Sequence, residues 1–138
     1  MKLFDTNVVV AAIITKREFH ERSYRAFLSS KQKSEACIGA HSLAEIYNTL
    51  SGRMKIPPLE AKKLMELNLQ DIEVVNLGDS EYSAAIARVS NLGISGGVVF
   101  DALLAECAVK RECDTLYTFN LTHFTRLGAD IKAIAREP

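Results

Sequence analysis

The first fourteen residues restrict the fold more than any other segment of the chain. A short apolar run, Met1 to Phe4, ends abruptly in the polar triplet Asp5-Thr6-Asn7, and a second apolar run follows directly. This order predicts a short buried strand, a turn and a buried helix. Asp5 would then lie at the carboxyl end of a strand, which is the edge where open α/β sheets bind ligands.

The rest of the chain continues the same alternation of short strands and helices. Further strands are predicted over 35–39, 71–77, 115–118 and 131–135. Helices are predicted over about 20–31, 42–53, 58–70, 80–90, 98–112 and 120–127. Such an alternation predicts an α/β fold with a mostly parallel sheet that helices cover on both faces. The length of 138 residues, without linker or repeat, predicts a single domain over 1–138.

Charge and cysteine content exclude several classes of protein. Lys plus Arg equals Asp plus Glu, 17 of each, but residues 1–70 carry a net charge of +4 and a basic cluster over 16–33. That cluster is either a solvated face or a surface that steers phosphate groups. Three cysteines without a CxxC pair give no disulfide framework or zinc motif, and they favour a reducing cytoplasm. We expect no signal peptide and no membrane span.

Three acidic residues and one amide are candidates for a functional site, and each has a structural alternative. Asp5 could be an ordinary turn or cap residue. Glu45 could complete a capping box with Ser42. Asp101 interrupts an apolar run after a glycine-rich loop, and could cap a helix that begins at Ala102. Asn120 follows the strand that ends at Thr118, and repeats the pattern of Asp5-Thr6-Asn7.

The functional interpretation requires these side chains to meet at one edge of the sheet. Asp5, Glu45 and Asp101 would repel one another in a shared cleft, and each would raise the pKa of the others. A divalent cation removes that conflict, and ligands that are all oxygen favour Mg²⁺ or Mn²⁺. A site of this kind hydrolyses phosphodiester bonds. Thr6, Asn7 and Thr118 would support it, and no histidine is assigned a catalytic role.

The motifs Leu3-Phe4-Asp5-Thr6-Asn7, Ser42-Leu43-Ala44-Glu45, Phe100-Asp101-Ala102 and Leu116-Tyr117-Thr118-Phe119-Asn120 together resemble the PIN-domain family, in particular its VapC-like toxin ribonucleases. The resemblance covers essentially the whole chain. It implies a three-layer α/β/α sandwich, endonucleolytic cleavage of RNA, and Mg²⁺ or Mn²⁺ bound by Asp5 and Asp101. Glu45 would be a further ligand or a base that orients water. The resemblance also implies a homodimer and a cognate antitoxin protein.

One position departs from the family pattern, and two other classes of function stay open. The fourth family position is often aspartate, so Asn120 would weaken a second metal site. A phospho-acceptor module like a receiver domain would need a lysine after the last core strand, but none follows Thr118 before Lys132. In a protein-binding module without catalytic activity, the carboxylates would only cap helices.

Overall fold

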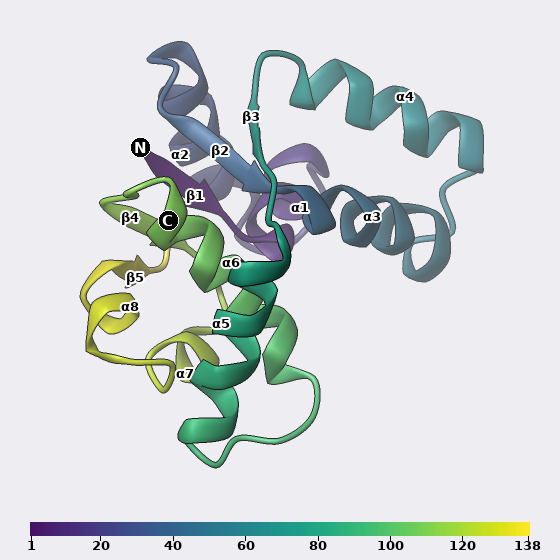
Figure 1. Ribbon diagram of the computed structural model, residues 1–138. Coiled ribbons are helices and arrows are strands. Elements are labelled where there is room, and N and C mark those ends of the chain that lie inside the picture. The colour runs from purple at the N-terminus through teal and green to yellow at the C-terminus, as the bar shows by residue number, and fades with distance from the viewer.

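The computed structural model describes residues 1–138, and its centre is the first strand of the chain (Figure 1). The five strands are β1 (Lys2–Phe4), β2 (Ala36–Gly39), β3 (Glu73–Val75), β4 (Thr115–Tyr117) and β5 (Ala135–Arg136). They form one sheet in the order β3-β2-β1-β4-β5, and all four pairings are parallel. The predicted α/β fold with a short parallel sheet is confirmed.

Successive strand residues point to opposite faces of the sheet, and this alternation divides the core in two. Leu3 pairs in register with Cys37 and Leu116, and all three belong to one buried cluster. Phe4 and Ile38 belong to the other cluster. The central strands β1 and β2 are therefore apolar on both sides, as expected for a parallel sheet between two layers of helices.

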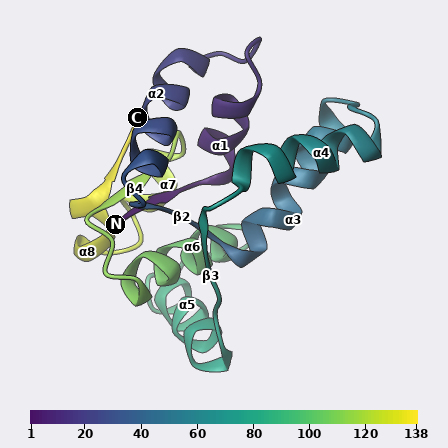
Figure 2. The same cartoon turned by 90° about the horizontal axis from the view of Figure 1, so that it is seen from above.

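The helices cover the two faces in two sets. The first set is α1 (Thr6–Ile13), α2 (His20–Gln32), α3 (Ala40–Asn48) and α4 (Pro58–Leu69), together with a π-helical turn, η1 (Thr49–Arg53). The second set is α5 (Asp79–Asn91), α6 (Val98–Lys110), α7 (Leu121–Phe124) and α8 (Ala129–Ile134). Figure 2 shows α1 and α2 on one side of the sheet and α5 and α6 on the other. The fold is thus a three-layer α/β/α sandwich.

Two parts of the predicted secondary structure need correction. The strand predicted over 131–135 is wrong, because residues 129–134 form α8 and only Ala135 and Arg136 join the sheet. The two isoleucines of that segment, Ile131 and Ile134, are three residues apart, which is helical spacing, and Ile131 is fully buried. The helix predicted over 42–53 begins two residues earlier, at Ala40, and its last turn widens into η1.

No helix of this fold combines the length and the apolar character that crossing a lipid bilayer requires. All three cysteines are free and buried.

Candidate functional site

Three neighbouring strands bring polar residues to the same edge of the sheet. Asp5 follows β1 directly, Thr118 follows β4, and β2 leads straight into α3. Because β2, β1 and β4 are adjacent and parallel, their carboxyl ends lie side by side. Residues that are separated by more than a hundred positions in the sequence therefore meet there.

A cavity of about 330 Å³ opens at this edge, and we call it the acidic cleft. Six of its lining residues are the predicted site residues Asp5, Thr6, Asn7, Glu45, Asp101 and Asn120. The seventh predicted residue, Thr118, is fully buried behind the cleft and contacts Asp5. The structure thus brings together every residue that the sequence analysis selected.

Asp5 is the most deeply buried carboxylate of the cleft, with 7% of its surface exposed. It occupies the N-cap position of α1, but its side chain makes no capping hydrogen bond. Instead, the Thr118 hydroxyl donates to Oδ2 at 2.7 Å. Burial raises the pKa of Asp5 to about 6, although the Thr118 hydrogen bond opposes the shift, and the charges of Asp101 and Glu45 add to the rise.

Glu45 does not form the capping box that its sequence context suggests. Because α3 begins at Ala40, Ser42 already lies inside the helix, and its hydroxyl has no hydrogen-bond partner. The Glu45 carboxylate accepts a hydrogen bond of 2.7 Å from the Thr6 hydroxyl of α1 instead. The first residues of α1 therefore orient Glu45 toward the cleft.

Asp101 is not a helix cap, because α6 begins at Val98 and the N-cap residue is Gly97. Its carboxylate lies 2.9 Å from Nδ1 of His123, on α7. Burial raises the pKa of Asp101, although the His123 contact opposes the shift. His123 is expected from the sequence to pack or to support the site and not to catalyse. No local pattern indicates its pairing with Asp101, because the two residues lie 22 positions apart on different helices.

The two asparagines organise the loop that follows β4. The side-chain oxygen of Asn7 accepts a hydrogen bond of 3.3 Å from the backbone N–H of Phe119. The backbone N–H of Asn120 donates to the Thr118 hydroxyl at 2.9 Å. Asn120 is the N-cap residue of α7, but its side chain forms no capping bond and lines the cleft.

Four polar residues of the cleft were missed as site residues: Arg17, Asn48, Thr49 and Arg53. Asn48 and Thr49 follow Glu45 by three and four positions, so all three lie on one polar face of the predicted helix, and that face indicates that they line the same cleft. Arg17 belongs to the basic cluster over 16–33, and three of the six basic residues of that cluster have partners elsewhere. Arg25 pairs with Glu21 in α2, and Lys31 donates to the backbone of Asn68.

No three acidic, histidine or cysteine side chains are gathered tightly enough to form a ready-made metal centre. In the cleft, each carboxylate is held by a donor of its own: Thr118 for Asp5, Thr6 for Glu45 and His123 for Asp101. The donor set still fits a hard divalent cation, because every ligand atom offered is oxygen. Desolvation and mutual repulsion leave Asp5 with a surplus of negative charge that a cation would relieve.

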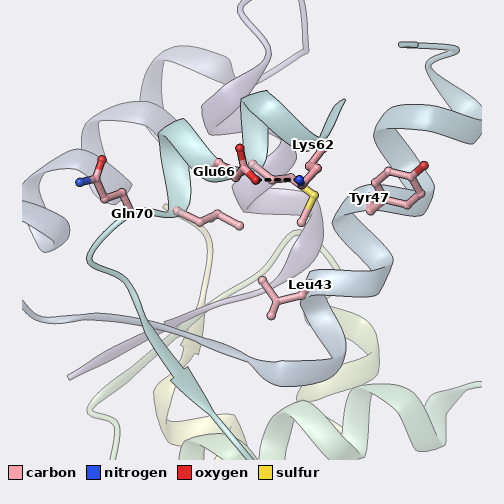
Figure 3. A pocket seen from close by; sticks show the side chains of 7 residues that line it. Leu43, Tyr47, Lys62, Glu66 and Gln70 are labelled. Carbon is pink, nitrogen blue, oxygen red and sulfur yellow. Dashed lines mark ion pairs between the residues drawn. The ribbon is translucent and has the colours of Figure 1, made fainter. Parts of the chain in front are cut away.

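The largest cavity of the molecule lies elsewhere and has a different chemistry. It measures about 500 Å³, and Figure 3 shows Leu43 and Tyr47 of α3 on one side of it and Lys62 and Glu66 of α4 on the other. Lys62 and Glu66 pair with each other at 3.3 Å on the solvent side. No set of carboxylates or other reactive groups converges there, so we assign the chemistry to the acidic cleft.

Known structures share this fold across nearly the whole chain. VapC20 of Mycobacterium tuberculosis, a sarcin-ricin loop cleaving toxin, aligns with a TM-score of 0.71 and 15% identity over 86% of this chain and 89% of its own. VapBC2 of Rickettsia felis, solved with a DNA fragment from its promoter, aligns with a TM-score of 0.73 and 20% identity over 99% and 98%. No curated protein sequence matches the chain.

At these identities the two structures establish a shared fold and nothing further. The sequence itself matches the PIN domain family over residues 2–129, which is nearly its full length. The chain belongs to the PIN-domain family.

Proposed function

We propose that this protein is an endoribonuclease that depends on Mg²⁺ or Mn²⁺ and hydrolyses phosphodiester bonds in RNA. The observation that carries the proposal is the burial of Asp5 beside Asp101 and Glu45, with no cationic side chain paired to it. A protein that used these carboxylates only as helix caps would not need to desolvate them together. Family membership and the structural likeness to a VapC toxin support the same function.

Asp5 and Asp101 would hold the metal ion, with Glu45 as a further ligand or as the base that orients water. A Mg²⁺ or Mn²⁺ ion held by these residues would supply Lewis-acid chemistry to the phosphate and to the attacking water. Asn120 offers a neutral oxygen where related proteins often have a carboxylate, so a second ion would bind more weakly. One tight metal site is therefore the expected resting state.

The remaining residues of the cleft position the reactive groups. Thr118, Thr6 and His123 each fix the orientation of one carboxylate through a hydrogen bond. Arg17 and Arg53 line the same cavity, and their guanidinium groups suit the phosphates on either side of the scissile bond. The hydrogen bond from Phe119 to Asn7 keeps the loop after β4 against α1.

We further propose that the protein is the toxin of a toxin–antitoxin pair, acts in the cytoplasm and forms a homodimer. The likeness to VapC20 and VapBC2 supports the antitoxin partner, and three free cysteines agree with a reducing compartment. Static light scattering should give twice the chain mass of 15.3 kDa. A monomer at all concentrations would contradict the dimer.

The decisive experiment is RNA cleavage with and without the metal. We expect cleavage with Mn²⁺ or Mg²⁺, none with EDTA, and a loss of about 100-fold or more in Asp101→Asn, because electrostatic stabilisation of the transition state disappears. Asp79→Asn changes an exposed acid of α5 outside the cleft and is the matched control. Equal rates in Asp101→Asn, Asp5→Asn and Asp79→Asn would refute the proposal.

Calorimetry with Mn²⁺ separates this function from the protein-binding module. The folded protein should take up Mn²⁺, and the Asp5→Asn variant should lose most of that affinity. A folded protein that binds no Mn²⁺ would favour a module whose carboxylates have no catalytic role.

A further inference from the structure

A second cavity adjoins the acidic cleft. It measures about 280 Å³ and is lined by Asn7, Ala11, Arg17, Glu18, Phe19, Phe119 and Asn120. Three of these residues, Asn7, Arg17 and Asn120, also line the acidic cleft. The two cavities are therefore adjacent, and a chain that crosses the carboxylates would reach the second cavity next. We call this second cavity the aromatic pocket.

Two phenylalanine rings give the pocket its character. The rings of Phe19 and Phe119 lie 5.1 Å apart between centroids, with an angle of 31° between their planes. The Arg22 guanidinium lies 4.2 Å from the Phe19 centroid and 5.1 Å from the Phe119 centroid. Arg22 is itself anchored by Glu137 at 2.8 Å. Cation–π contacts thus hold both rings in place before any ligand binds.

Phe19 has an unusual backbone conformation at the start of α2. Its φ angle is 64°, a left-handed conformation that is rare for bulky side chains. Despite that strain, 44% of the residue is exposed, so the ring is not buried in a core. Four other non-glycine residues between helices and strands also have a positive φ, so the angle by itself does not mark a site. Phe19 differs from them because its ring lines a cavity beside the carboxylates. Here the strained backbone presents an aromatic ring to a cavity.

We propose that the aromatic pocket binds one unstacked nucleobase of a single-stranded RNA, next to the phosphate held in the acidic cleft. Flat aromatic rings stack on bases of any identity. The pocket has room for one base. Arg17 lines both cavities, so its guanidinium can bind a phosphate that lies between them. The Glu18 carboxylate can accept a hydrogen bond from an amino group of the base.

This inference rests on the proposed ribonuclease function and specifies its substrate as a single strand or a loop. A double helix keeps its bases stacked and could not insert one. The position of the aromatic pocket beside the carboxylates favours RNA over an apolar side chain of a protein partner, since a nucleic acid alternates phosphates with flat rings.

The test measures binding of single-stranded RNA to the Asp101→Asn protein, which leaves the probe uncut. Fluorescence anisotropy compares a labelled uridine octamer and a labelled adenosine octamer with an abasic ribose-phosphate octamer. Phe19→Gly removes the ring while the backbone stays in a conformation that glycine accepts. Phe19→Trp keeps a stacking surface, and Phe119→Leu keeps the apolar volume. Tyr82→Ala removes a comparably exposed aromatic residue on α5, away from both cavities.

We expect Phe19→Gly to weaken binding of both octamers by about 5- to 150-fold, the range for loss of one stacked base. Phe119→Leu should have a smaller effect in the same direction, and Phe19→Trp and Tyr82→Ala should bind as the parent does. The abasic octamer should bind all variants alike, because it has no base to stack.

Two results would overturn the inference, and they differ from failure of the nuclease proposal. Unchanged affinity in Phe19→Gly would assign the pocket to another occupant, such as a side chain of a protein partner. If Phe19→Gly lost the same binding affinity for octamers with and without bases, the residue would act on the backbone of the RNA and not on a base. If the unmodified protein neither cleaves nor binds RNA, both proposals fail together.

Discussion

The acidic cleft and the cluster around Arg88 both bury carboxylates, but only the cluster pairs its carboxylates with a positive charge. Arg88 of α5 donates to Glu106 of α6 at 2.8 Å and to both carboxylate oxygens of Asp130 at 3.0 and 3.1 Å. It also donates to the backbone oxygen of Leu127. The contact with Arg88 lowers the pKa of Asp130. In the acidic cleft, burial raises the pKa of Asp5 instead.

The difference separates a structural use of charge from a functional one. Glu106 is as buried as Asp5, with 8% and 7% exposed, but its charge is balanced by a guanidinium that ties α5, α6 and α8 together. Asp5 has only the Thr118 hydroxyl as a side-chain partner. An acid that the fold buries without a counter-charge lowers stability, so its presence indicates a ligand that supplies the charge.

The largest expected effect on stability follows from removing the guanidinium. Arg88→Met leaves Glu106 buried and unpaired, and we expect it to lower the free energy of unfolding by about 3–5 kcal/mol in urea titrations. The double variant Arg88→Met with Glu106→Gln removes the orphaned charge and should recover part of the loss. If Arg88→Met were as stable as the parent, Arg88 would not stabilise the buried charge of Glu106, and the contrast with the acidic cleft would be wrong.

Asp5→Asn should raise the stability of the protein, and the size of the gain should depend on pH. The folded-state pKa of about 6 lies above the ordinary value of 3.8, so the folded protein keeps a proton that the unfolded chain releases. Stability of the parent therefore falls as pH rises from about 4 to 6. The variant has no carboxyl group at position 5 that could titrate, so its stability does not fall in this way. Its free energy of unfolding should be about equal to that of the parent at pH 4 and about 2–3 kcal/mol higher above pH 6.

Urea titrations of the metal-free proteins at pH 4 and 7.5 measure this difference. Added Mn²⁺ should stabilise the parent and leave Asp5→Asn nearly unchanged. Glu106→Gln serves as the comparison, because it should destabilise the protein at pH 7.5. An Asp5→Asn protein that is less stable than the parent at both pH values would make Asp5 a structural residue.

The smallest effect concerns the position that departs from the family pattern. Asn120→Asp adds a charged oxygen to the cleft, and we expect it to tighten Mn²⁺ binding by about 5- to 10-fold in calorimetry. The same charge should lower the stability of the metal-free protein, because it meets the repulsion that already acts on Asp5. Unchanged affinity would show that residue 120 does not reach the ion.

The sequence predicts the fold and the acidic residues of the cleft, because both depend on local patterns, but it does not select the two arginines of the cleft. Strand, polar triplet and helix recur at Asp5 and at Thr118, and parallel strands bring such positions to one edge. The capping box at Ser42 and the strand over 131–135 fail because tertiary packing overrides them. The helix α3 starts directly after Gly39, and Ile131 is buried from a helix.

Contacts between distant helices could not be predicted in the same way. The pairing of His123 with Asp101 and the position of Arg22 between two phenylalanines depend on how elements pack. Neither leaves a periodic pattern in the sequence. The left-handed φ angle of Phe19, in the turn between α1 and α2, is likewise not indicated by its residue type.

The central strand β1 and its neighbour β4 lie far apart in the sequence, with more than a hundred positions between Asp5 and Thr118. Asp5 is therefore synthesised well before Thr118 and Asn120, which complete its surroundings. A chain whose synthesis has not yet reached β4 cannot assemble the cleft. The order of the strands thus couples the formation of the cleft to the synthesis of β4.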